Sequence, residues 1–243
     1  MKKMNFSLLV LPLIFLFASC GFMGGERIVG DGNWKSEERT VGSFKDIQVS
    51  GAAGVHLIQG EAKPVRIEID QNLQQYVEVF VEGGTLTIRT KSGFNVDPSK
   101  EMAVYVTAPS FNDINVSGAG SIVTDAKINN PGPINIGISG AGDIKVEVNA
   151  PKVGVDISGA GSATMVGETR DFELGITGAG KAKCFDLKAE NTTVTISGAG
   201  DADVFASQKL DASTSGAGSI RYKGKPADVK SGKSGAGSIE AVE

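Results

Sequence analysis

Few side chains in this chain could carry out catalytic or metal chemistry. Histidine occurs once, at His56, and the two cysteines, Cys20 and Cys184, are far apart in the sequence. This set is too small for a zinc site of the Cys/His type, and it offers no trio of nucleophile, base and orienting acid. The alternation of apolar residues predicts that His56 points to solvent and that Cys184 is a small apolar core residue. We therefore expect no catalytic residue, no metal and no cofactor.

Two further kinds of site depend on carboxylates. Calcium-binding β-rolls need an aspartate in every repeat, but the positions equivalent to Asp201 are mostly serine, with one lysine. Glycoside hydrolysis needs two carboxyl groups within about 5–10 Å of each other. Asp143 and Asp201 lie three repeats apart, roughly 14 Å at the spacing of neighbouring strands. We expect no calcium dependence, and a polysaccharide-active enzyme is the least favoured alternative.

The amino-terminal residues have the pattern of an export signal. Lys2 and Lys3 precede an apolar run over residues 8–17, which is too short to span a membrane, and Ala18-Ser19-Cys20 follows. This pattern resembles the lipobox of bacterial lipoproteins, which implies that Cys20 is lipidated and becomes the first residue of the mature chain. We predict a signal peptide over residues 1–19 and a lipid anchor in the cell envelope. Gly21 does not match the aspartate that retains some lipoproteins at the inner membrane, so the outer membrane is favoured, facing either the periplasm or the cell surface.

The charge of the mature chain limits its partners. Removal of residues 1–19 takes away two lysines and leaves 22 basic and 28 acidic residues, a net charge of about −6. This balance argues against nucleic acid and against electrostatic binding to anionic lipid. The membrane contact is therefore predicted to be the lipid on Cys20. Residues 20–37 contain several glycines without a sustained period and are predicted to form a flexible tether.

Internal repetition dominates the rest of the sequence. The tetrapeptide Ser-Gly-Ala-Gly, or once Thr-Gly-Ala-Gly, recurs at successive spacings of 22, 19, 19, 20, 18 and 19 residues. Its first residues are Ser117, Ser139, Ser158, Thr177, Ser197, Ser215 and Ser234. Apolar residues alternate with polar ones on both sides of each motif, which predicts strand, small-residue corner, strand.

Stacked units of this length predict a single-domain, all-β parallel β-helix over residues 38–243, built from coils of about 19 residues. The usual hand of parallel crossover connections predicts a right-handed helix. Residues 111–243 form the regular repeats, and residues 38–110 are interpreted as irregular coils. Lys183, Asp203, Arg221 and Glu240 form an outward column of alternating charge. Ser231 and Lys233 replace apolar residues in the final repeat, as expected of a polar cap.

The chain resembles a known family over about Glu38 to Glu243. The resemblance rests on the run Glu38–Ile47, on Ser50-Gly51, on the runs Val55–Gly60 and Ile67–Leu73, and on the Ser-Gly-Ala-Gly units. These residues look like the putative auto-transporter adhesin, head GIN domain family. The resemblance implies a β-helical envelope lipoprotein with a role in adhesion. It supplies no binding or catalytic residues to carry over.

The sequence therefore predicts a non-enzymatic, lipid-anchored envelope protein that presents a rigid β-helical surface to a glycan or a protein. The alternative is a structural or assembly component in the periplasm, in which ends or faces of the solenoid pair into homo-oligomers. The chain has few aromatic residues for stacking on sugars.

Overall fold

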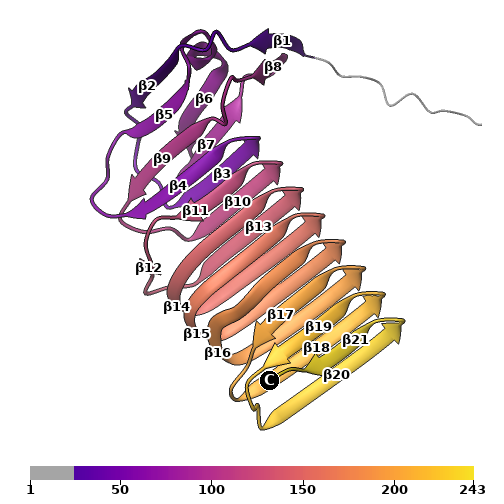
Figure 1. The fold of residues 1–243 in the computed structure, drawn as a ribbon. Coiled ribbons are helices and arrows are strands. Elements are labelled where there is room, and N and C mark those ends of the chain that lie inside the picture. Colours follow the sequence, from indigo (N-terminus) through magenta and orange to yellow (C-terminus); the bar gives the residue numbers. More distant parts are fainter. Residues whose placement is uncertain (1–24) are drawn as a thin grey trace, which may run out of the picture.

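The computed structural model describes residues 25–243. The predicted signal peptide, residues 1–19, and the predicted lipidation site, Cys20, lie outside the described residues. The described chain is nearly all β and forms a β-solenoid of about seven turns of about 19 residues each. Figure 1 shows the coils stacked below a cap that contains the N-terminal strands. This arrangement confirms the predicted β-helical fold class.

The regular coils consist of strands that pair in parallel with the coils before and after them. In chain order they are β3 (Asp46–Gly51), β4 (Gly54–Gln59), β10 (Asp113–Gly118), β11 (Ser121–Thr124), β12 (Ile128–Asn129), β13 (Ile134–Gly140), β14 (Asp143–Gly159), β15 (Ser162–Gly178), β16 (Lys181–Gly198), β17 (Asp201–Phe205), β18 (Lys209–Gly216), β19 (Ser219–Lys223), β20 (Asp228–Gly235) and β21 (Ser238–Ala241).

The repeats are stacked in exact register at the motif serine. Ser139 pairs with Ser158, Ser158 with Thr177, and Thr177 with Ser197. The apolar residues on either side therefore form inward columns, and nearly all of them are fully buried in one continuous core. Burial of these columns is the main stabilising contribution, because one coil alone cannot cover its own apolar face.

The corner after each motif serine depends on glycine. Gly159 has φ +116°, a conformation that other residues rarely adopt. A Cβ atom at Gly159 would lie 2.5 Å from the carbonyl oxygen of Gly140 in the preceding coil. The N–H of Ala160, the next residue, donates a hydrogen bond to the same Gly140 oxygen at 2.8 Å. The small residues thus let successive corners approach closely enough to continue the hydrogen-bond ladder.

A second bend lies within the long strands. In β14 and β15 the pairing continues from Ala150 and Thr169 to Lys152 and Asp171, and it omits Pro151 and Arg170 between them. We call this position the second corner. Each regular coil therefore has two strand segments joined by the Gly-Ala-Gly corner and by the second corner.

The cap differs from the predicted irregular coils over residues 38–110. It contains β1 (Glu26–Val29), β2 (Trp34–Arg39), β5 (Val65–Asp70), the 3-10 helix η1 (Gln71–Tyr76), β6 (Val77–Glu82), β7 (Thr85–Thr90), β8 (Phe94–Asp97) and β9 (Ala103–Ala108). β7 and β9 pair in parallel with β3 and β4, as a coil would. β2 and β6, however, run antiparallel to β5 and β7, and β5 runs antiparallel to β9. The coil interpretation is therefore wrong for β5 and β6.

The predicted tether is also shorter than expected. β1 pairs in parallel with β8, and β2 pairs with β5 along its whole length, so residues 26–37 are largely strand. Trp34 begins β2 and is half-buried, with the Lys100 ammonium 5.7 Å from its ring. Residues 26–37, which composition alone assigned to the tether, are thus fixed by pairing with strands that are distant in the sequence.

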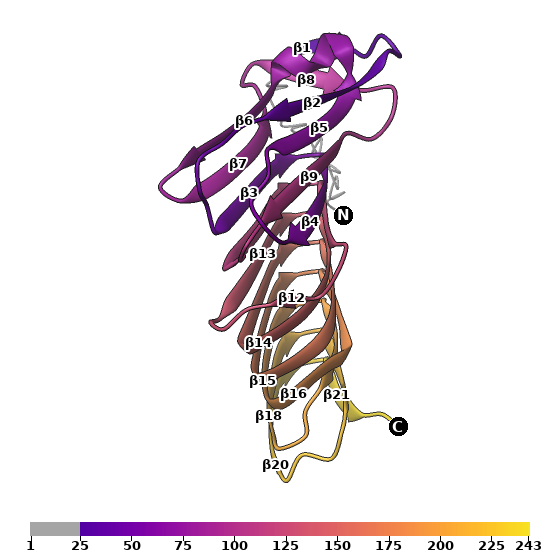
Figure 2. The same cartoon turned by 90° about the vertical axis from the view of Figure 1, so that its left-hand side faces the viewer.

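The two ends of the solenoid differ. Figure 2 shows the cap at one end and β20 at the other. All eight residues of β20 are exposed, including Ser231 and Lys233. This agrees with the predicted polar end of the stack, where the last coil covers buried residues of the coil before it.

Candidate functional site

His56 lies on the outward side of β4, as predicted, with 36% of its side chain exposed. Its Nδ1 atom lies 2.9 Å from Oδ1 of Asp125, and its ring stacks on Tyr105 with a centroid distance of 4.8 Å. The Arg66 guanidinium lies 3.8 Å from the centre of the Tyr105 ring. The neighbours of His56 are thus a surface stack across β4, β9 and β5. The stack contains no nucleophile that His56 could activate.

Cys184 is fully buried in the core, as predicted. Burial raises the pKa of its thiol to about 12, because no solvent stabilises the charged form. At neutral pH the group is a protonated thiol, and it is sealed from any substrate. Cys184 therefore packs as a small apolar side chain and is no nucleophile.

Asp70 is a buried carboxylate that the sequence reasoning did not single out. Its oxygens accept hydrogen bonds from the Ser99 hydroxyl at 2.6 Å, the Ser99 N–H at 2.8 Å and the Gly32 N–H at 2.8 Å. Burial alone would raise the pKa of Asp70, but the hydrogen bonds from Ser99 and Gly32 outweigh it and lower the pKa. The carboxylate joins the loops before β2 and after β8 to the end of β5, so its role is structural.

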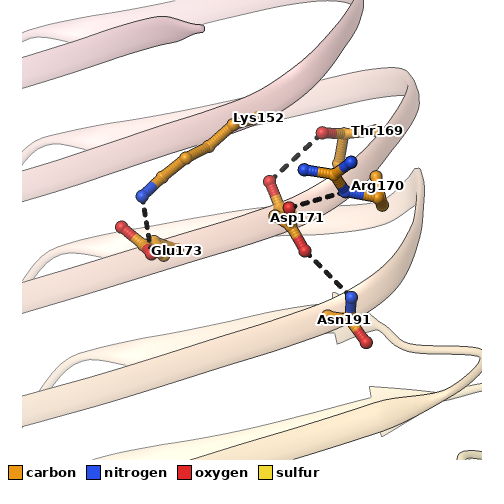
Figure 3. A network of polar contacts seen from close by, with 6 residues as sticks. All are labelled: Lys152, Thr169, Arg170, Asp171, Glu173 and Asn191. Carbon is orange, nitrogen blue, oxygen red and sulfur yellow. Dashed lines mark hydrogen bonds and ion pairs between the residues drawn. The ribbon is translucent and has the colours of Figure 1, made fainter.

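A polar network crosses the coils beside the second corner (Figure 3). Asp171 accepts hydrogen bonds from the Asn191 amide at 2.9 Å and from Arg170 Nε at 2.8 Å. The Asn191 amide, followed by Arg170, lowers the pKa of Asp171. Lys152 Nζ lies 2.7 Å from Oε1 of Glu173 in the next coil. These contacts link neighbouring coils and hold the charged side chains in place on the surface.

A shallow groove of about 430 Å³ lies at the second corner next to this network. Its lining residues come from three successive coils and the strand that follows: Asn149, Ala150, Pro151, Glu168, Thr169, Arg170, Lys188, Ala189, Glu190, Phe205 and Ser207. We call it the second-corner groove. Two carboxylates and two cationic groups face it, and the Lys188 ammonium lies 4.4 Å from the centre of the Phe205 ring. The groove is suited to a polar ligand that makes hydrogen bonds along the stack.

A second charged hollow, of about 450 Å³, lies over the strands that follow the Gly-Ala-Gly corner. It contains the predicted column of alternating charge. Arg221 makes two hydrogen bonds of 2.8 Å to the carboxylate of Asp203. Among the described residues, this is the one neighbouring pair of that column that forms an ion pair. The alternation therefore gives one cross-strand contact rather than a continuous ladder.

Residues 25–243 contain no group of three or more His, Cys, Asp or Glu side chains that could hold a metal ion. In the same part of the chain, no helix has the length and apolar character needed to cross a membrane. The absence of calcium dependence stays a prediction, as does lipidation at Cys20.

Comparisons with known proteins agree with this geometry. A putative adhesin from Bacteroides fragilis is 24% identical to the chain, with a TM-score of 0.82 over 88% of this chain and 100% of that one. A putative lipid binding protein from Parabacteroides distasonis is 25% identical, with a TM-score of 0.74 over 90% and 100%. A putative adhesin from Parabacteroides distasonis is 28% identical, with a TM-score of 0.71 over 89% and 100%. No curated protein matches the chain.

The family pattern named "Putative auto-transporter adhesin, head GIN domain" matches residues 43–226. The match covers β3 to β19 and so includes both the inner part of the cap and the regular coils. The chain belongs to the putative auto-transporter adhesin, head GIN domain family.

Proposed function

We propose that this chain is a non-enzymatic adhesin or binding module of the cell envelope, anchored in the outer membrane by a lipid on Cys20. The observation that carries the proposal is the exact register of the coils, which repeats outward side chains at fixed spacing on a rigid stack. A surface of this kind is ordered before a partner arrives, so little conformational entropy is lost on binding.

The strand boundaries support a particular orientation. Cys20 is five residues before Gly25, and five extended residues span at most about 18 Å. A lipid on Cys20 would therefore keep the cap close to the membrane. The coils and β20 would then project away from it, so that the second-corner groove is accessible to a large ligand.

The second-corner groove is the proposed ligand-binding surface. Arg170 and Lys188 can donate hydrogen bonds, while Asn149, Glu168 and Glu190 offer oxygen acceptors. This mixed set suits a hydroxyl-rich glycan or a polar protein surface, and the near balance of charge does not favour a strongly charged partner. The groove is open, so a long ligand could extend beyond it along the solenoid axis.

The test is binding of the purified protein to a glycan array, with the Arg170→Ala/Lys188→Ala double variant beside it. Exposed Lys35 and Lys91 provide a control, since Lys35→Ala/Lys91→Ala removes the same charge in the cap, away from the groove. We expect the groove variant to lose binding and the control to keep it. Equal binding by both variants would reject the groove, and turnover of a polysaccharide in a hydrolase and lyase screen would reject the non-enzymatic role.

The open end of the solenoid favours a second candidate, an assembly component that forms homo-oligomers. Within residues 25–243, β20 pairs with β18 alone, so its other edge has free backbone groups there. Lys230 and Lys233 oppose edge pairing by their charge. Sedimentation at low and high salt tests this candidate, which requires a concentration-dependent oligomer that Val229→Lys in β20 weakens.

A further inference from the structure

An apolar hollow of about 300 Å³ lies where three loops of the cap meet, away from both charged hollows. The loops join β2 to β3, β4 to β5 and β9 to β10, and all three lie at the left-hand edge of the molecule in Figure 1. The lining residues are Val41, Gly42, Ser43, Phe44, Lys45, Ala62, Lys63, Ala108, Pro109 and Ser110. We call this hollow the loop pocket.

The walls of the loop pocket are fixed by hydrogen bonds to the backbone of its loops. The Lys45 N–H donates to the Gly84 oxygen at 3.1 Å, and the Asn112 N–H donates to the Lys45 oxygen at 2.8 Å. The side-chain amide of Gln59 donates a hydrogen bond to the Pro109 carbonyl oxygen at 2.9 Å. Phe44 is half-buried and packs against the core. The pocket is therefore already formed in the unliganded chain, as most small-molecule sites are.

The charge of the loop pocket is opposite to that of the chain. The sequence has a net charge of −4, yet the pocket lining holds two lysines and no carboxylate. Neither Lys45 nor Lys63 belongs to an ion pair formed by the described residues. Asp46 lines a neighbouring hollow that shares Phe44 and Lys45 but does not line the loop pocket. The side chains of Lys45 and Lys63 could thus reach an anionic group at this rim, and Glu61, the exposed neighbour of Ala62, does not line the pocket.

We propose that the loop pocket binds a small amphiphilic carboxylate of medium chain length. Its apolar body would pack against Val41, Phe44 and Pro109, and its carboxylate would lie between the Lys45 and Lys63 ammonium groups. The pocket volume lies at the lower end of the roughly 300–1,000 Å³ typical of ligand sites, which favours a single chain of medium length over a two-chain lipid. The hydroxyls of Ser43 and Ser110 add hydrogen-bond donors to the rim.

The test is calorimetric titration of decanoate into a chain that begins at residue 20 and carries Cys20→Ser, which retains every strand of the structure. We expect the Lys45→Gln/Lys63→Gln double variant to bind about tenfold more weakly, a change of about 1.4 kcal/mol. Ala62→Phe places a ring in the pocket from an exposed position and should abolish binding. Lys209→Gln/Lys225→Gln changes the charge equally and should leave binding unchanged.

Two further arms separate the proposal from non-specific adsorption. Decanol has the same apolar body without the charge, so it should bind at least threefold more weakly than decanoate. The chain should not cosediment with vesicles containing anionic phospholipid in the absence of decanoate. The proposal is overturned if the double lysine variant or Ala62→Phe binds decanoate as tightly as the parent chain, or if the vesicles bind and decanoate does not.

Discussion

Replacing the corner glycine Gly159 by alanine tests how the coils are held in register. Alanine at Gly159 meets two unfavourable terms. The first is the backbone conformation at φ +116°, worth about 1–3 kcal/mol. The second is the contact of the new Cβ atom with the Gly140 oxygen at 2.5 Å, for which overpacking of this kind costs about 1–3 kcal/mol. We expect Gly159→Ala to lower the free energy of unfolding by about 2–6 kcal/mol.

Gly51 provides a matched control because it occupies the same corner in the first regular coil. Its φ is +102°, but a Cβ atom there would meet no atom within 4 Å. Gly51→Ala should therefore lose only the backbone term, about 1–3 kcal/mol. Ser162→Ala, just beyond the corner of Gly159, should change stability least, and Gly159→Val should be more destabilising than Gly159→Ala.

The assay is urea denaturation followed by far-UV circular dichroism and by the fluorescence of Trp34, the one tryptophan. Trp34 reports on the cap and circular dichroism on all strands, so coincident transitions show that cap and coils unfold together. In thermal unfolding, each kcal/mol corresponds to about 2–4 °C for a chain of this size. Equal losses for Gly159→Ala and Gly51→Ala would refute the reasoning that close stacking of the corners requires glycine.

Four further outcomes are expected. Cys20→Ala should abolish incorporation of labelled lipid and membrane retention, and equal membrane partition of the variant would contradict the anchor. The pKa of Asp70 is lower in the folded chain than in the unfolded chain. The stabilisation that its carboxylate gives is therefore complete above the unfolded pKa of about 3.9, and it is lost as the pH falls through the folded pKa. Asp70→Asn should thus destabilise by about 1–3 kcal/mol at pH 7 and flatten the acid limb of the stability curve, whereas Asp186→Asn, at an exposed position, should leave the stability at pH 7 unchanged. Cys184 should react with iodoacetamide only after denaturation, and rapid labelling of the native chain would argue against its burial. Millimolar calcium should leave the melting temperature unchanged. A rise of many degrees would contradict the conclusion that Asp201 and the equivalent positions in the other repeats bind no calcium.

The regular coils could be predicted because every coil repeats the same inward columns. Ser158, Thr177 and Ser197 pair as the motif alignment requires, and the residues at fixed offsets from them are buried. Period-two alternation fixes the face of each residue, and the repeat length fixes the neighbour. The outward position of His56 and the inward position of Cys184 follow from the same rule.

The cap could not be predicted in this way because its pairings join segments that share no repeat. Trp34 in β2 pairs with Asp70 in β5, and Glu26 in β1 pairs with Phe94 in β8. No local pattern links such residues, so the composition of the segment led to the prediction that Glu26 and Trp34 lie in a tether. Asp70 was missed because its burial depends on Ser99 and Gly32, which reach it only through the tertiary fold.

The surface sites were not predicted for a related reason. The second-corner groove depends on side chains that change from coil to coil, such as Asn149, Glu168 and Lys188, which occupy one aligned position. The repeat specifies where this position lies but not which residue fills it. The loop pocket depends on three loops outside the repeats, so the motif alignment gives no information about it.

Protease treatment of intact cells tests the central claim most directly, because an adhesin has to be exposed on the outside of the cell. A protease that is active on the purified protein is added to whole cells, and the chain is then followed by immunoblotting, with a periplasmic protein as the control for intact envelopes. The proposed function predicts that the chain is cleaved while the control protein remains whole. Full protection of the chain in intact cells, with cleavage after lysis, would contradict an outward-facing adhesin and would favour the periplasmic assembly role.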